Sequence, residues 1–165
     1  MAQGAHVIDI GANEGQFGRR LRQGGYGGHI LSVEPIPAVR ETLMAAGAGD
    51  AKWAVAPALA FGAEAGTATL SVSEATDMSS LAPLTRQAEA MLGDTRQSAS
   101  IEVTVTTLDE VAPKWLDDTA HPALKIDTQG TELDVLRGGR QVMDRFIVLI
   151  LELSLVPLYQ GEPDW

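Results

Sequence analysis

Short apolar runs, each ended by a glycine or an acidic residue, recur in the first third of the chain and predict buried parallel strands. The first spans residues 6–10 and the second 29–33, with a third expected at 52–56. Helical patterns separate them at residues 16–23 and at about 38–46. Strands that alternate with helices are typical of an α/β fold with a parallel sheet.

The predicted helices carry sequence signals for their ends. Asn13 is the expected N-cap of the first helix, with Gln16 as its capping-box partner, and Gly24 follows its last turn. A later helix is expected to open at Thr131, which together with Asp134 forms a plausible capping pair.

The middle of the chain follows a different pattern. Residues 67–73 and 101–107 alternate between apolar and polar positions, which predicts two half-exposed antiparallel strands inserted into the fold. Between them, residues 74–100 are polar and rich in Ala, Ser and Thr. We expect this insertion to be either a mobile loop or a lid with one short helix near residues 84–92.

The parallel pattern resumes at residues 123–126, which are followed by a turn at 127–130. The last expected strand, residues 146–153, is almost uninterruptedly apolar, as is typical of a strand covered on both faces. No linker or repeat divides the sequence, so residues 1–165 are predicted to form a single doubly wound, Rossmann-like domain with a mostly parallel sheet.

Composition narrows the possible functions. The 165 residues have a formal net charge of −10 and include no cysteine, which excludes disulfides, thiol nucleophiles and cysteine-bound zinc. The acidic balance disfavours a nucleic-acid partner, because binding to phosphates requires Lys and Arg. Three scattered histidines do not suggest a metal site, and no apolar run is long enough to span a membrane. With no signal peptide at the start, we expect a cytoplasmic protein without metal, nucleic-acid or membrane partners.

Polar residues follow the predicted strands where ligands of doubly wound sheets bind, beyond the carboxyl ends of the strands. The first strand leads into the turn GANEG, in which Gly11 and Gly15 lack a Cβ and Asn13 tolerates left-handed backbone. The second strand ends at Glu34. Glu152 interrupts the last strand, and the sequence leaves open whether it contacts a structural partner or a substrate.

These strand-end residues favour one class of ligand. The dinucleotide-binding fingerprint requires glycines where this chain has Asn13 and Gln16, which disfavours a pyrophosphate site. Glu34 is placed to accept hydrogen bonds from a ribose diol, and Asp9, beside the glycine turn, suits a cationic ligand better than a phosphate. A nucleoside with a ribose, an ammonium group and no phosphate is S-adenosylmethionine.

Four segments in this order, VIDIGANEGQF, SVEPIP, LKIDTQGTELDVLRGG and LELSLVPLYQGEP, resemble the FkbM family of S-adenosylmethionine-dependent methyltransferases, which have a class I, Rossmann-like fold. The resemblance implies that the cofactor loop consists of Asp9, Gly11, Asn13 and Gly15. It implies that Glu34 binds the ribose. Asp127 would face the methionine moiety or the methyl-transfer site and is also the candidate catalytic residue.

The resemblance also implies O-methylation of a hydroxyl group on a small molecule, a natural product or a sugar, with S-adenosylhomocysteine as the product. The Asn/Asp-Pro-Pro-Tyr turn used by methyltransferases that act on amino groups of bases is absent. Two alternatives remain. One is a non-catalytic S-adenosylmethionine-binding or assembly module. The other, an NAD-dependent oxidoreductase, would need the missing glycines and a Tyr-x-x-x-Lys pair, which the sequence lacks.

Compared with a seven-stranded class I methyltransferase, the sequence stops early. A further helix and the C-terminal strand hairpin would be expected after residues 146–153, which would otherwise form an open sheet edge. We therefore expect either that the C-terminal part of the full fold is absent from this chain or that a partner, such as a second copy in a homo-oligomer, covers the edge.

Overall fold

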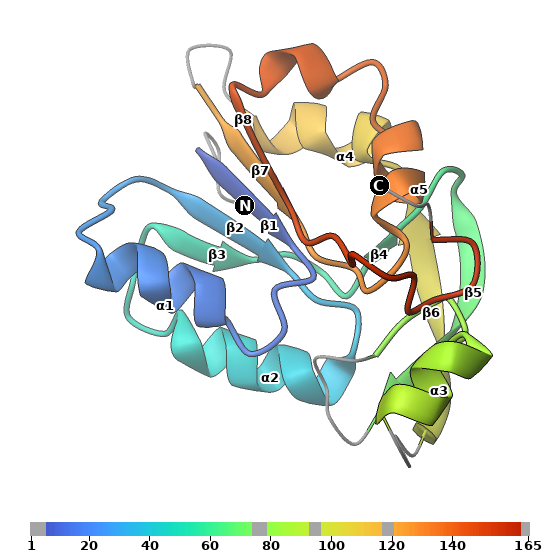
Figure 1. Cartoon of the computed structure of the whole chain (residues 1–165). Helices are drawn as coiled ribbons and strands as arrows, with labels where there is room; N and C mark the ends of the chain where they lie inside the picture. The colour runs from blue at the N-terminus through green and yellow to red at the C-terminus, as the bar shows by residue number, and fades with distance from the viewer. Residues whose placement is uncertain (1–5, 74–78, 93–96, 117–120, 163–165) are drawn as a thin grey trace.

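A five-stranded parallel sheet lies at the centre of the computed structural model, which describes residues 6–73, 79–92, 97–116 and 121–162 (Figure 1). Its strand order is β3-β2-β1-β7-β8, and every neighbouring pair is parallel. The strands are β1 Val7–Ile10, β2 Ile30–Val33, β3 Trp53–Val55, β7 Ala123–Ile126 and β8 Val148–Leu151. This arrangement confirms the predicted Rossmann-like α/β fold.

Helices cover the two faces of this sheet (Figure 1). Trp53 and Leu43 belong to the apolar cluster between the sheet and α1 (Gln16–Gln23) with α2 (Pro37–Ala46). Leu108 and Val135 belong to the cluster on the other face, with α4 (Leu108–Trp115) and α5 (Glu132–Arg137). In the part of the chain that the structure describes, none of the helices is long and apolar enough to cross a membrane.

A second, three-stranded sheet packs beside the first. Its strands are β4 Ala60–Phe61, β5 Gly66–Ser73 and β6 Gln97–Thr106, in the order β4-β6-β5. The antiparallel pairing of β5 with β6 confirms the predicted inserted pair, whereas β4, which runs parallel to β6, was not predicted. Two residues are too few to show a periodic pattern.

Helix α4 was not predicted from the sequence either. Pro113 lies inside it, and proline is normally unfavourable in the interior of a helix. The helix is nevertheless capped, since the Thr107 side chain accepts a hydrogen bond from the Glu110 backbone N–H at 3.3 Å. Its buried face, which includes Leu108, Ala112 and Trp115, packs into the main core.

The insertion at residues 74–100 contains α3 (Arg86–Leu92), which confirms the short helix predicted near residues 84–92. Residues 74–78 and 93–96 lie outside the described residues. Ser80 forms a bridge with Ser71 of β5, and Leu84 forms one with Tyr159. The described part of the insertion is therefore attached both to the second sheet and to the segment after β8.

Two predicted caps are wrong. Gly15, not Asn13, is the N-cap residue of α1, and it makes no side-chain capping bond. Thr131 is the N-cap residue of α5 but likewise forms no side-chain cap. In both places a carboxylate side chain holds the turn instead: that of the distant Glu34 accepts from the Asn13 N–H, and that of the nearby Glu132 accepts from the Gly130 N–H.

The last strand differs from the expected one in length and in burial. It spans Val148–Leu151 rather than residues 146–153, and it lies at an edge of the sheet. The prediction that both its faces are covered is wrong for this chain, since Val148, Leu149 and Ile150 are each more than 40% exposed. The expected open edge is present.

Candidate functional site

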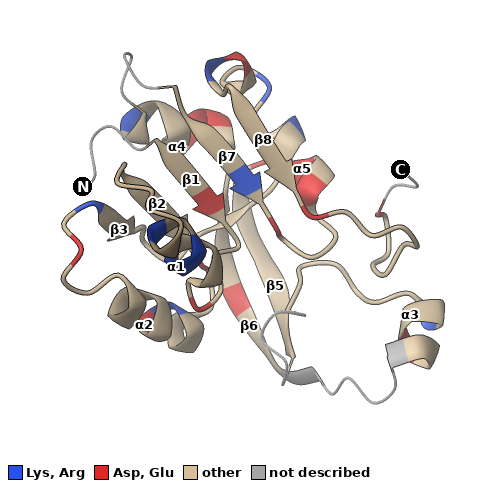
Figure 2. Cartoon of the chain, turned by 60° about the vertical axis from the view of Figure 1, so that its left-hand side comes forward, with Lys and Arg blue, Asp and Glu red and all other residues tan. Residues whose placement is uncertain are grey.

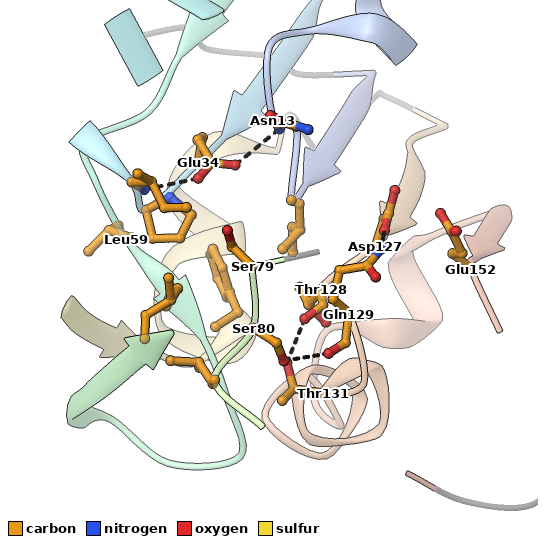
Figure 3. Close-up of a pocket in the computed structure, with 18 of the residues that line it drawn as sticks. Asn13, Glu34, Leu59, Ser79, Ser80, Asp127, Thr128, Gln129, Thr131 and Glu152 are labelled. Atoms are coloured by element: carbon orange, nitrogen blue, oxygen red, sulfur yellow. Dashed lines mark hydrogen bonds between the residues drawn. The ribbon is translucent and has the colours of Figure 1, made fainter. Parts of the chain in front are cut away.

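A cavity of about 410 Å³ opens beyond the carboxyl ends of β1, β2, β7 and β8 (Figure 3). This is where ligands of doubly wound sheets bind, and the volume is in the range of small-molecule sites. The strand-end turns supply most of its polar residues, and the residues from these turns are Gly11, Asn13, Glu34, Asp127, Thr128, Gln129, Thr131 and Glu152. The second sheet and the neighbouring segments supply Leu59, Phe61, Leu70, Ser79, Ser80, Leu81 and Leu158 on the other side.

The glycine turn after β1 has the left-handed backbone expected from its sequence. The φ angles are 72° at Gly11, 47° at Asn13 and 86° at Gly15. A Cβ on Gly11 would lie 1.8 Å from the main-chain oxygen of Asp127, so only glycine allows the turns after β1 and β7 to approach this closely. Gly11 and Asn13 line the cavity, whereas Gly15 packs against Leu43 and Trp53 outside it.

Glu34 lies at the end of β2 and is 5% exposed. Its Oε2 accepts a hydrogen bond from the Asn13 backbone N–H at 3.0 Å and its Oε1 accepts one from the Ile36 N–H at 2.9 Å (Figure 3). Burial raises the pKa of Glu34, while these two hydrogen bonds favour the charged form. Each carboxylate oxygen keeps a further lone pair for a ligand hydroxyl.

Asp9 does not line the cavity. In β1, successive side chains point to opposite faces of the sheet, and that of Asp9 is fully buried below the strand ends. Its carboxylate lies 3.0 Å from Lys125 Nζ on the neighbouring strand β7. Figure 2 shows the acidic position on β1 beside the basic position on β7. Burial raises the pKa of Asp9, and the positive charge of Lys125 acts in the opposite direction.

Lys125 connects this buried acid to the cavity. Its Nζ also lies 3.2 Å from Asp127 Oδ2 and donates to the Gly11 carbonyl oxygen at 3.3 Å. Burial alone would lower the pKa of Lys125, but the carboxylates of Asp9 and Asp127 hold it above its usual value. Sequence reasoning missed this residue, although a lysine within an apolar strand is itself a signal that a buried acid must pair with it.

Asp127 follows β7 and lines the cavity. Its two carboxylate oxygens have different partners, since Oδ1 accepts from Gln129 Nε2 at 2.8 Å and Oδ2 pairs with Lys125. Glu152, just after β8, lines the cavity as well. Its pKa is raised, first by a hydrogen bond with Asp127 and next by burial.

The structure thus brings Gly11, Asn13, Glu34 and Asp127 together around one cavity. Asp9 and Gly15 do not line it. It adds Ser80, Gln129 and Glu152 to the lining. The sequence had placed Gln129 in the turn at residues 127–130 and had left the role of Glu152 open. The contacts of Ser80 and Gln129 join segments far apart in the chain, so no local pattern could indicate them.

The chemistry of the cavity is acidic. Three carboxylate side chains face it, and among the described residues that line it there is no Lys, Arg or His. The part of the chain that the structure describes also shows no group of three or more His, Cys, Asp or Glu residues able to hold a metal ion. Such a cavity favours a ligand that carries positive charge and hydroxyl donors.

One of three comparisons with known proteins found a match. A search of curated proteins and a search of solved structures found no match. A family model, the methyltransferase FkbM domain, matches residues 9–165, which include every residue of the cavity. The chain therefore belongs to the FkbM methyltransferase family.

Proposed function

We propose that the chain binds S-adenosylmethionine in this cavity and methylates a hydroxyl group of a small-molecule or glycan acceptor. The observation that carries the proposal is the set of three carboxylates, Glu34, Asp127 and Glu152, at the ends of three strands around one cavity. S-adenosylmethionine has a ribose diol, an ammonium group and a sulfonium, which are the groups that such a set can bind. When bound, it supplies an electrophilic methyl group and leaves as S-adenosylhomocysteine.

Glu34 fits the ribose. The backbone N–H groups of Asn13 and Ile36 hold its carboxylate in place, so little side-chain freedom is left to lose when a ligand binds. Hydroxyl donors from a diol would add to these bonds and offset the cost of keeping the carboxylate buried. Gly11 and Asn13 line the adjacent part of the cavity, where their main chain can approach the ligand.

Asp127 fits the reacting end of the cavity. Methyl transfer to a hydroxyl group requires that the acceptor and the donor be aligned and that the hydroxyl proton be removed. We propose that Asp127 takes this proton, since its carboxylate lines the cavity and is held by both Lys125 and Gln129.

The charge of the cavity also limits the acceptor. With carboxylates on its wall and no basic residue among the described lining residues, it disfavours an acceptor that carries phosphate or sulfate groups. Leu70, Leu81 and Leu158 offer an apolar surface for the body of the acceptor. We therefore infer an acceptor that is neutral or cationic, such as a natural product or an unphosphorylated sugar, and not a nucleic acid.

Calorimetry with S-adenosylmethionine, S-adenosylhomocysteine and NAD tests the binding part of the proposal. We expect heat from the first two and none from NAD, and tight NAD binding without binding of S-adenosylmethionine would contradict the proposal. Transfer of a labelled methyl group to a panel of hydroxyl compounds, each paired with its phosphate ester, tests the catalytic part. We expect product from unphosphorylated members only, while binding without any turnover would favour a non-catalytic binding module.

A further inference from the structure

The turn that follows β7 contains a conformation that a glutamine rarely adopts. The φ angle of Gln129 is 57°, and that of the next residue, Gly130, is 97°. Positive φ is unfavourable for a residue with a Cβ. A residue that keeps such a conformation beside a ligand cavity suggests that its side chain has a role there.

The backbone of the turn is held by another residue. The buried carboxylate of Glu132 accepts hydrogen bonds from the Thr128 N–H at 2.7 Å and from the Gly130 N–H at 3.0 Å. These bonds stabilise the turn from within its own segment. The side chain of Gln129 is consequently not needed to close the turn and makes tertiary contacts instead.

Three parts of the chain meet at Gln129: the turn after β7 and the segments that contain Ser80 and Tyr159. Its Nε2 donates to Asp127 Oδ1 at 2.8 Å, and its Oε1 accepts from the hydroxyl of Tyr159 at 3.1 Å. Its main-chain oxygen accepts a short hydrogen bond from Ser80 Oγ. Tyr159 and Ser80 are only 2% and 3% exposed, so water competes little for these bonds.

The partners of Gln129 are themselves joined to each other. The Thr85 N–H donates to the Leu158 oxygen at 2.8 Å, and the Gln160 N–H donates to the Pro83 oxygen at 2.8 Å. Residues 80–85 and 157–160 therefore form one connected wall, which contributes Ser80, Leu81 and Leu158 to the cavity. We call these two segments the cavity wall.

We propose that Gln129 is a positioning residue. Its one side-chain amide orients the Asp127 carboxylate and also holds the cavity wall in place, so the two are coupled. The proposal rests on the proposed function insofar as Asp127 faces the reacting end of the ligand. A purely structural residue would affect only how firmly the cavity wall is held. Loss of the Gln129 amide should also change how strongly Asp127 favours S-adenosylmethionine over S-adenosylhomocysteine.

Hydrogen–deuterium exchange of the ligand-free chain tests the attachment of the wall. In Gln129→Leu, which keeps a similar size but removes both side-chain bonds, we expect the Thr85 and Gln160 amides to exchange about three- to tenfold faster. Tyr159→Phe, which removes one hydroxyl, should act in the same direction. Gln141→Leu, at an exposed position, is the matched control and should leave these amides unchanged.

Calorimetry tests the orientation of Asp127. The sulfonium of S-adenosylmethionine is attracted by a carboxylate, and the uncharged thioether of S-adenosylhomocysteine is not. We expect the ratio of the two affinities to fall by about three- to tenfold in Gln129→Leu, the size of one hydrogen bond. Asp127→Asn should lower the same ratio, and the double variant should show no further loss, because Gln129 acts through Asp127.

The outcomes separate this inference from the proposed function. Unchanged exchange at Thr85 and Gln160 in Gln129→Leu would overturn the inference even if the wild-type chain binds S-adenosylmethionine. Equal losses of affinity for S-adenosylmethionine and S-adenosylhomocysteine in Gln129→Leu would overturn the inference as well, and so would additive losses in the double variant. Gln129 would then have a structural role only. Failure of the wild-type chain to bind either ligand would overturn the proposed function, and the exchange measurement would still decide whether Gln129 fastens the wall.

Discussion

Lys125 and Asp9, which lie opposite each other on neighbouring parallel strands, form an ion pair of 3.0 Å beneath the cavity. The carboxylate is fully buried and the lysine side chain is 12% exposed. The same Nζ contacts Asp127 and the Gly11 carbonyl oxygen, so the pair connects the glycine turn to the candidate catalytic residue.

Breaking this pair should destabilise the fold. Lys125→Met leaves the carboxylates of Asp9 and Asp127 near each other without a counter-charge, and we expect a loss of about 3–5 kcal/mol in the free energy of unfolding. Urea denaturation measures this loss. The double variant Asp9→Leu, Lys125→Met removes the orphaned charge and should recover part of it, so a double variant less stable than Lys125→Met would contradict this account.

Glu34 should matter for ligand affinity. In Glu34→Gln an amide NH₂ replaces one acceptor oxygen and faces the backbone N–H of Asn13 or Ile36. We expect the affinity for S-adenosylmethionine to fall by about 1–3 kcal/mol, because a buried polar group loses its partner. Calorimetry measures the change, with the exposed Glu41→Gln on α2 as the control. Equal affinities of the two variants would remove Glu34 from the binding site.

Asp127→Asn should separate binding from turnover. The amide keeps the size of the side chain but cannot take a proton, and general-base catalysis typically contributes about 10²–10⁴-fold to the rate. We expect methyl transfer to fall by that order, while S-adenosylmethionine still binds with an affinity reduced only several-fold. Turnover and affinity both near wild type would show that Asp127 is not the base.

The stability of the ligand-free chain should depend on the ionisation of Glu152. Its pKa is raised in the folded chain, first by the hydrogen bond with Asp127. A carboxyl group whose pKa is higher in the folded than in the unfolded chain favours folding while it is protonated. This contribution is fully present below the unfolded value and is lost as the pH rises through the folded one.

Glu152→Gln removes this dependence. We expect the free energy of unfolding of the variant to rise relative to that of wild type as the pH increases from acidic values to pH 8. The difference should be smallest below the usual glutamate pKa. Thermal unfolding at several pH values measures the difference, and Glu64→Gln, in an exposed loop, provides the control. A difference between Glu152→Gln and wild type that stays constant with pH would contradict the interaction with Asp127.

The edge of the sheet at β8 should promote self-association of this chain. Ile147, Leu149 and Ile150 are 65%, 43% and 41% exposed, and an apolar edge strand offers unpaired backbone groups to a second copy. We expect light scattering after size exclusion to show oligomers, and Leu149→Lys to reduce them. A wild-type chain that stays monomeric at high concentration would show that this edge does not pair with itself.

Much of the fold could be predicted because it is encoded locally. The strands that precede Gly11, Glu34 and Asp127 are short apolar runs, and their parallel order follows from the helices between them. The elements that were missed have weak local signals, since β4 has two residues and α4 contains Pro113. The cap predicted at Asn13 failed because α1 begins only after Gly15 and Asn13 has a left-handed φ of 47°, with its N–H bound by the distant carboxylate of Glu34.

The sequence by itself determined the parallel α/β architecture, the left-handed glycine turn and the strand-end positions of Glu34 and Asp127. Tertiary structure alone decided which acids face the cavity. Asp9 and Asp127 both belong to strand-end segments, yet the register of β1 with β7 places Lys125 against Asp9 and buries that carboxylate. Tertiary structure also brought Ser80 and Tyr159 to Gln129. Burial and long-range hydrogen bonds depend on what packs alongside a residue, and no pattern within one segment contains that information.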